Sequence, residues 1–179
     1  MNQKLKTACQ KFRIYLKFPI LHQIKLAKKN ESDLLFLKIE IFKKFDFCSS
    51  FEIIPVPVFK FNKSILIKTF DLPTLMATKL QAILYRKWEK TDKKGKILVK
   101  VKGRDYFDLM WYLEKEIKPN LKCIENIKTE KELKGKLLKI IKNLDENSIR
   151  LDLENFIENK VFVKNLSKNL KDILMRNFV

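Results

Sequence analysis

Residues Ile65–Met76 read Ile-Leu-Ile-Lys-Thr-Phe-Asp-Leu-Pro-Thr-Leu-Met, and the hydrophobic pattern of the chain changes within this stretch. Before it, apolar residues alternate with polar ones, which is the period of a half-buried strand. After it, apolar residues recur at helical spacing, at Leu72, Leu75, Met76, Leu80 and Ile83. Asp71 is a suitable N-cap, and Pro73 suits a first helical turn. The change predicts an α+β protein in which strands precede helices.

The N-terminal part of the chain predicts a small, mainly antiparallel sheet. The alternating pattern covers three regions, broken at Pro19 and by a turn at Phe61–Ser64: Phe12–Ala27, Leu34–Phe45 and Glu52–Phe70. We expect these segments to form a meander. Residues 2–11 read as a short helix. We therefore divide the chain into a sheet region, 1–70, and a helical region, 71–179.

The C-terminal part predicts a helical bundle. The first helix should run from Asp71 to about Trp88, and a Lys-rich loop with a short β segment at 97–99 follows it. A strongly apolar helix is expected to start at Asp105. Beyond Pro119 the pattern is helical throughout, with helices expected at 129–144, 148–158 and 163–176.

The charge of the chain restricts its partners. With 39 basic and 21 acidic residues, the formal net charge is +18, so polyanions such as nucleic acids should be attracted to it. Nearly all basic residues are lysines spread along the chain, and a general Lys bias would explain much of the excess. No apolar run is long enough to span a bilayer, and no signal peptide is recognisable, which predicts a cytoplasmic protein.

Cysteine and histidine usage excludes several kinds of site. Cys9, Cys48 and Cys123 are odd in number and widely spaced, which argues against a disulfide framework or a zinc site. The single histidine, His22, lies in an alternating stretch and is expected to be a packed strand residue. One histidine makes a Ser/His/Asp triad improbable and rules out a metal site built from several histidines.

Three side chains could take part in catalysis or binding, and for each a purely structural role is the alternative. Glu40 interrupts an apolar strand, and it either faces solvent or lines a cleft as a metal-binding carboxylate. Lys79 lies among apolar helix residues, and its ammonium either reaches past them to solvent or points at a phosphate. Asp105 either caps a helix, with Asp108 completing a capping box, or acts as a base in phosphoryl transfer. For Glu40 the alternation favours the solvent-facing interpretation, and for Asp105 helix capping is a sufficient explanation by itself. For Lys79 the residues alone do not decide.

Part of the chain resembles the AbiEii/AbiGii-type nucleotidyltransferases. The matching pieces are Asp71-Leu72, then Thr78-Lys79-Leu80-Gln81-Ala82-Ile83 with Arg86, then Lys102-Gly103-Arg104-Asp105-Tyr106-Phe107-Asp108-Leu109. Leu37–Ile41 is similar to the strand that precedes them in this family. The likeness runs from about Leu34 to Leu113, and Lys102–Leu109 is its most specific part.

The resemblance implies a polymerase-β-like nucleotidyltransferase fold, of which this chain would hold a partial sheet. Family members transfer a nucleotide from an NTP, some of them to tRNA, and often act as toxins in type IV toxin–antitoxin or phage-defence systems. By analogy Lys79, Arg86 and Arg104 would bind phosphates, and Asp105 would be a catalytic carboxylate. Glu40 would be a further acid at a Mg²⁺ site. An antitoxin protein is a further expected partner.

One departure from the family pattern concerns its metal site. The family's first motif combines a Gly-Ser or Gly-Gly turn with an Asp-x-Asp pair, and none of these occurs in the 179 residues. Asp152-Leu153-Glu154 is the nearest candidate, but it lies in the helical region. We expect a truncated or split enzyme that is inactive as this chain alone and works only with an upstream metal-binding segment. The alternative is a non-catalytic basic protein that binds RNA or an antitoxin.

Overall fold

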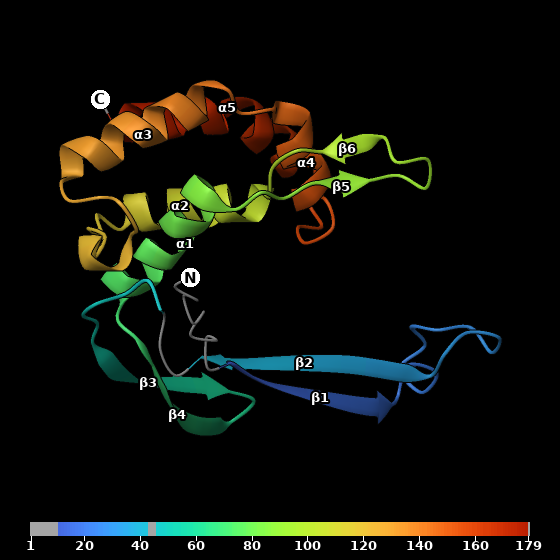
Figure 1. Ribbon diagram of the computed structural model, residues 1–179. Helices are drawn as coiled ribbons and strands as arrows, with labels where there is room; N and C mark the ends of the chain where they lie inside the picture. Colours follow the sequence, from blue (N-terminus) through green and yellow to red (C-terminus); the bar gives the residue numbers. More distant parts are fainter. Residues whose placement is uncertain (1–10, 43–45, 179) are drawn as a thin grey trace, which may run out of the picture. The chain divides into compact units, whose positions relative to one another are not determined.

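The computed structural model describes residues 11–42 and 46–178 (Figure 1). By its internal contacts the chain divides into two compact units, Met1–Asp46 and Phe47–Val179. We call the first the hairpin unit and the second the helical unit, and each is described by itself. The helix predicted at 2–11 lies outside the described residues, except that Lys11 begins a strand.

The hairpin unit contains two antiparallel strands, β1 (Lys11–Pro19) and β2 (Leu34–Phe42). The predicted alternation is confirmed by the register, in which Phe12 lies opposite Ile41 and Phe18 opposite Leu35. One face of the hairpin is therefore entirely apolar, and its eight side chains are all exposed: Phe12, Ile14, Leu16, Phe18, Leu35, Leu37, Ile39 and Ile41. We call this set the apolar face.

The first strand ends earlier than predicted. β1 stops at Pro19, and residues 21–25 form a turn instead of continuing the strand to Ala27. His22 lies in this turn, so its prediction as a packed strand residue is wrong. Its Nε2 is 3.0 Å from the Lys28 carbonyl and 3.1 Å from that of Glu31. The histidine therefore holds a loop together.

The helical unit begins with a second hairpin, formed by β3 (Ile53–Lys60) and β4 (Lys63–Phe70). Phe61 and Asn62 connect the strands with φ of 50° and 57°. Two successive residues with positive φ make the tight turn whose twist matches an antiparallel pair. The turn predicted at Phe61–Ser64 is therefore shorter, because Lys63 and Ser64 already pair with Lys60 and Phe59.

All strand pairs are antiparallel, which confirms the α+β class, but the predicted meander is wrong. Among the described residues the strands form three separate two-stranded sheets. Pro55 and Pro57 remove two N–H donors from β3, which suits a strand at the edge of a sheet and not in the middle of one. The third sheet joins β5 (Lys90–Thr91) to β6 (Ile97–Val99), where the sequence predicted a short β segment.

Helices form the body of the helical unit (Figure 1). α1 covers Leu72–Tyr85 and α2 covers Gly103–Glu114, and the two are in contact. Asp71 occupies the N-cap position of α1, as predicted, but its side chain makes no capping hydrogen bond within the described part of the chain. α2 begins two residues before Asp105, and its N-cap is Lys102. Asp105 therefore lies in the first turn, and the capping alternative is wrong for it.

Three further helices complete the bundle: α3 (Glu130–Lys142), α4 (Glu146–Leu153) and α5 (Lys160–Phe178). They follow a short 3-10 helix at Leu121–Cys123. Apolar side chains of all five helices meet in one core, whose fully buried members include Leu80, Leu109, Leu137, Ile141, Leu153 and Leu170. No described helix is both long and apolar enough to cross a membrane.

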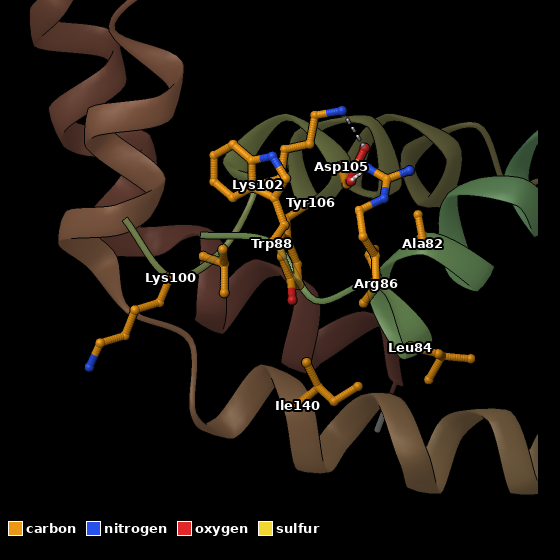
Figure 2. Close-up of a pocket in the computed structure, with 11 residues that line it drawn as sticks. Ala82, Leu84, Arg86, Trp88, Lys100, Lys102, Asp105, Tyr106 and Ile140 are labelled. Carbon is orange, nitrogen blue, oxygen red and sulfur yellow. Dashed lines mark hydrogen bonds and ion pairs between the residues drawn. The ribbon is translucent and has the colours of Figure 1, made fainter. Parts of the chain in front are cut away.

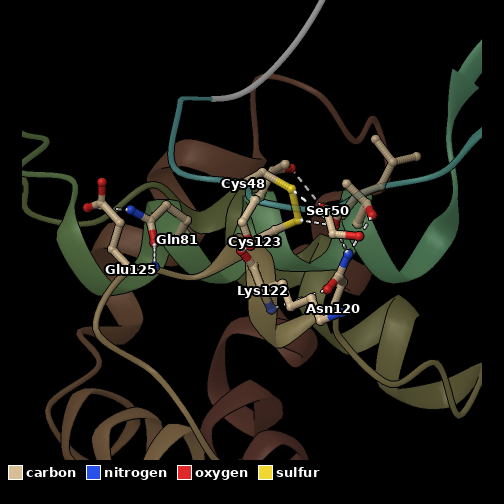
Figure 3. Close-up of a disulfide and its surroundings, with 11 residues drawn as sticks. Cys48, Ser50, Gln81, Asn120, Lys122, Cys123 and Glu125 are labelled. Atoms are coloured by element: carbon tan, nitrogen blue, oxygen red, sulfur yellow. Dashed lines mark hydrogen bonds between the residues drawn. A yellow bond between two sulfur atoms is a disulfide. The ribbon is translucent and has the colours of Figure 1, made fainter. Parts of the chain in front are cut away.

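The segment that precedes β3 is hydrogen-bonded to the turn after α2. The Ser49 amide donates to the Lys122 carbonyl at 3.2 Å, and Asn120 Nδ2 donates to the Ser50 carbonyl at 2.7 Å (Figure 3). These contacts bring Cys48 beside Cys123, and the two form a disulfide. The prediction that argued against a disulfide framework from cysteine number and spacing is wrong for this pair, because the fold closes a separation of 75 residues.

Candidate functional site

The helical unit collects basic side chains around one carboxylate. Lys79 comes from α1, Arg86 from its C-cap, and Lys102 from the residue before α2. Because α1 packs on α2, these three cations reach the first turn of α2, where Asp105 lies. Residues that are up to 26 positions apart in the sequence therefore meet at one place.

Asp105 is the centre of this cluster, and its side chain is only 5% exposed. Its Oδ2 accepts from Arg86 Nη1 at 2.9 Å, and its Oδ1 lies 3.9 Å from Lys102 Nζ (Figure 2). The same Oδ1 lies 3.5 Å from Lys79 Nζ. A carboxylate this deeply buried requires such partners, because an unpaired buried charge is costly. The structure thus brings Lys79 and Asp105 together, with their charged groups in contact.

Asp108 is a second acid of the cluster. It was expected to complete a capping box and belongs to the Lys102–Leu109 motif, but it was not predicted to be a partner of Lys79. Its Oδ2 lies 2.6 Å from Lys79 Nζ, so Lys79 bridges two carboxylates that are three residues apart on α2. Residues three apart lie on the same face of a helix. This spacing in the sequence could have shown that Asp105 and Asp108 share one partner. The Lys79 side chain is about one-third exposed.

The cluster borders a pocket of about 280 Å³. Arg86, Lys102 and Asp105 lie together in its wall, with Trp88 and Tyr106 among the other lining side chains (Figure 2). Lys100 also lines the pocket, but Figure 2 shows its ammonium pointing away from Asp105. The pocket therefore combines apolar and aromatic walls with cationic groups at one end.

The surroundings shift two proton equilibria in the pocket. Burial lowers the pKa of Lys102, the cations Arg86, Arg104 and Lys79 lower it as well, and Asp105 acts in the opposite direction. Burial, together with the Asp105 charge, raises the pKa of Tyr106 to about 12. Mutual repulsion among the cations means that a bound anion would be favoured, since it would stabilise the charged form of Lys102.

The side chain of Arg104 pairs with Asp152 on α4 and not with the adjacent Asp105. Its backbone N–H and its Nε both reach Asp152 Oδ2 on α4, at 3.2 Å and 3.4 Å. Asp152 was noted in the sequence only as part of the nearest match to a missing motif. Its burial in the bundle and its role as partner of Arg104 could not be recognised without the packing of α4 on α2.

Gly103 has a packing reason for its place in the Lys102–Leu109 motif. A Cβ at this position would lie 2.9 Å from the backbone oxygen of Ile149 and 3.1 Å from its Cα. Only a glycine lets the first turn of α2 approach α4 this closely. The glycine thereby helps to place Arg104 beside Asp152 and Asp105 beside its cations.

Glu40, the third predicted site residue, lies in the hairpin unit. Its Oε1 is 3.0 Å from Arg13 Nε on the facing strand and 2.9 Å from Lys38 Nζ. It stands opposite Arg13 in the register, on the face of the hairpin away from the apolar face, as the alternation predicted. Its role as a metal-binding acid stays a prediction.

The residues of the cluster do not suit a divalent metal ion. Across residues 11–42 and 46–178 there is no group of three or more His, Cys, Asp or Glu side chains that could hold one. Both oxygens of Asp105 already face cations, which would repel a metal ion from the same place. The arrangement holds three cations, Lys79, Arg86 and Lys102, around two carboxylates, Asp105 and Asp108.

The comparisons with known proteins identify the family. A family model described as "Nucleotidyl transferase AbiEii toxin, Type IV TA system" matches residues 2–178. Searches of curated proteins and of solved structures gave no significant match. The family match extends over both units and includes the Lys79, Arg86 and Asp105 cluster. The chain belongs to the AbiEii nucleotidyltransferase toxin family of type IV toxin–antitoxin systems.

Proposed function

We propose that the helical unit binds the triphosphate of an NTP and that the chain takes part in transferring the nucleotide to RNA, with tRNA as the expected acceptor. The observation that carries the proposal is the convergence of Lys79, Arg86 and Lys102 on Asp105 at one end of a pocket. Family membership supports a nucleotidyltransferase-type toxin with a nucleotide substrate and an antitoxin partner.

The charge balance of the cluster favours an anion. Three cations face two carboxylates, Asp105 and Asp108, and Lys79 and Arg86 are each at least one-third exposed. A guanidinium has five N–H donors, of which Arg86 uses one on Asp105, so several remain for phosphate oxygens. In this reading Lys79, Arg86 and Lys102 would contact the phosphates, and Asp105 would act as a positioning residue that keeps them side by side.

Transfer of a nucleotide needs more than this cluster provides. In the family a divalent metal, expected to be Mg²⁺, would stabilise the attacking and leaving oxygens. The 179 residues contain no Asp-x-Asp pair, and the cluster does not suit a metal. The proposal therefore makes transfer conditional on metal-binding acids supplied by a further segment, and it assigns to this chain the binding and orientation of the nucleotide.

The proposal can be tested by nucleotide binding in the absence of catalysis. Titration of the chain with a fluorescent ATP analogue should saturate, and Arg86→Ala or Lys79→Ala should weaken binding about tenfold, because each removes a charge-assisted phosphate contact. Lys100→Ala is the matched control, since this lysine lines the same pocket but points away from Asp105. Equal loss in all three variants, or no binding by the wild-type chain, would refute the proposal.

A second experiment addresses the transfer reaction itself. Incubation of the chain alone with Mg²⁺, labelled NTPs and total tRNA should leave the RNA unlabelled. Clear labelling would contradict the requirement for a further segment. The alternative function, non-catalytic binding of RNA or of an antitoxin protein, is favoured by the net charge of +18. It needs no nucleotide pocket, so saturable ATP binding that depends on Arg86 would argue against it.

A further inference from the structure

A second buried carboxylate organises a surface beside the pocket. Asp152 on α4 is completely buried. Its Oδ1 lies 3.1 Å from Lys90 Nζ, and its Oδ2 accepts from the backbone and the side chain of Arg104. Because an unpaired charge at this depth would be costly, Asp152 holds both long side chains in defined positions.

Each of the two cations that Asp152 holds also lies over an aromatic ring. The Arg104 guanidinium carbon is 3.9 Å from the ring centroid of Phe156, and Lys90 Nζ is 5.2 Å from that of Trp88. Phe156 is 56% exposed, although it is anchored by a guanidinium. An exposed ring that is held in place can stack on a planar ligand without first losing conformational freedom. We call Trp88, Lys90, Arg104 and Phe156 the stacking surface.

The stacking surface continues from the nucleotide pocket. Trp88 lines that pocket together with Arg86 and Lys102, and the ammonium of Lys90 lies over its ring. Arg104 lies between Lys102 and Asp105 in the sequence, at the start of α2. A ligand on the stacking surface would thus lie next to a nucleotide bound at Lys79, Arg86 and Lys102.

The geometry points to single-stranded RNA as the ligand of the stacking surface. Alternating rings and cations match a strand whose bases stack and whose phosphates pair with positive charge. In a duplex the base faces are covered by neighbouring pairs, so Phe156 and Trp88 could not stack on them. A non-aromatic polyanion would use the cations but not the rings. The inference rests on the proposed function for the acceptor class, whereas binding itself requires no catalysis.

The test uses the intrinsic fluorescence of Trp88. The chain has two tryptophans, so Trp111→Phe leaves Trp88 as the only one. In this background, without NTP, a single-stranded oligoadenylate of about 10 nucleotides should quench Trp88 and bind at least tenfold more tightly than a duplex of equal length. Quenching reports a base near the ring, which long-range attraction to the charged chain would not produce.

Substitutions at Phe156 then separate stacking from charge. Phe156→Leu should weaken binding of the oligoadenylate about tenfold, the effect of losing one stacked base, and Phe156→Tyr should retain it. Phe59→Leu is the control, because Phe59 is also a highly exposed phenylalanine but lies on β3. The inference is overturned if Trp88 is not quenched, if the duplex binds equally well, or if Phe156→Leu and Phe59→Leu have equal effects.

The outcomes also distinguish this inference from the proposed function. If RNA quenches Trp88 but the wild-type chain binds no ATP analogue, the stacking surface stands and the nucleotide pocket falls. If the analogue binds through Arg86 but RNA fails to quench Trp88, only the stacking surface is refuted.

Discussion

The hairpin unit and the helical unit use apolar residues in opposite ways. In the helical unit, side chains such as Leu80, Leu137 and Leu170 are completely buried in one core. In the hairpin unit, the eight side chains of the apolar face are between 36% and 52% exposed. A two-stranded hairpin cannot bury its own face, and in isolation it is marginally stable at best. Stable positioning of catalytic or binding groups is therefore expected in the helical unit.

The acidic residues show the same contrast. Glu40 in the hairpin unit pairs with Arg13 and Lys38 at the surface, where an ion pair contributes little and is screened by salt. Asp105 and Asp152 in the helical unit are buried, and cations surround them. Removing a partner from a buried carboxylate leaves an uncompensated charge, so these two acids fix the geometry of their neighbours in a way that Glu40 does not.

The largest expected effect is on the core. Leu137→Ala should destabilise the helical unit by about 3 kcal/mol, because it leaves a cavity between helices, whereas Leu37→Ala on the apolar face should cost less than about 1 kcal/mol. Hydrogen exchange measures the stability of the two units separately. Losing about 3 kcal/mol of unfolding free energy in Leu137→Ala corresponds to roughly hundredfold faster exchange of the slowest amides of α3 and α5. If Leu37→Ala accelerated exchange of β1 and β2 by a similar factor, the apolar face would be covered in solution and the contrast would disappear.

A smaller effect is expected from the close approach of α2 to α4. Gly103→Ala should cost about 2 kcal/mol, since its Cβ would overlap the backbone of Ile149. Gly135→Ala in α3 is the matched control, because nothing lies within 4 Å of its added Cβ. There alanine should stabilise the helix by about 0.5–1 kcal/mol. Chemical denaturation followed by fluorescence measures both, as Trp88 and Trp111 belong to the helical unit. A gain in stability at both glycines would show that the motif does not need its glycine for packing.

Local pattern predicted the elements of this fold better than their association. Alternation identified β1 to β4, and helical spacing located α1 and the bundle, because each reflects burial of one side of a single element. The separation of the strands into three hairpins could not be read in this way. It depends on which strand edges find partners, and a local alternation pattern carries no information about that.

The candidate site was predicted in part for a similar reason. Lys79 and Asp105 were selected from their place in the helical pattern and Arg86 by resemblance to a family motif, and the structure places both cations in contact with Asp105. The partner of Arg104 was missed because Asp152 is 48 residues away and reaches it only through the packing of α4 on α2. Trp88 and Phe156 belong to no sequence motif. Their contacts with Lys90 and Arg104, seen only in the structure, distinguish them from other aromatic residues.

The smallest effect is a change in one proton equilibrium, and it tests whether the cations of the cluster act on one another. Burial and the charges of Arg86, Arg104 and Lys79 lower the pKa of Lys102, while Asp105 opposes them. Asp105→Asn removes the opposing charge and should lower the pKa of Lys102 further, whereas Arg86→Met removes a repelling charge and should raise it. NMR titration of isotope-labelled lysine measures both shifts. A bound ATP analogue should also raise the pKa, because its phosphates favour the ammonium form. An unchanged pKa of Lys102 in both variants would mean that burial alone controls it, and the argument for a cooperative anion site would lose its electrostatic basis.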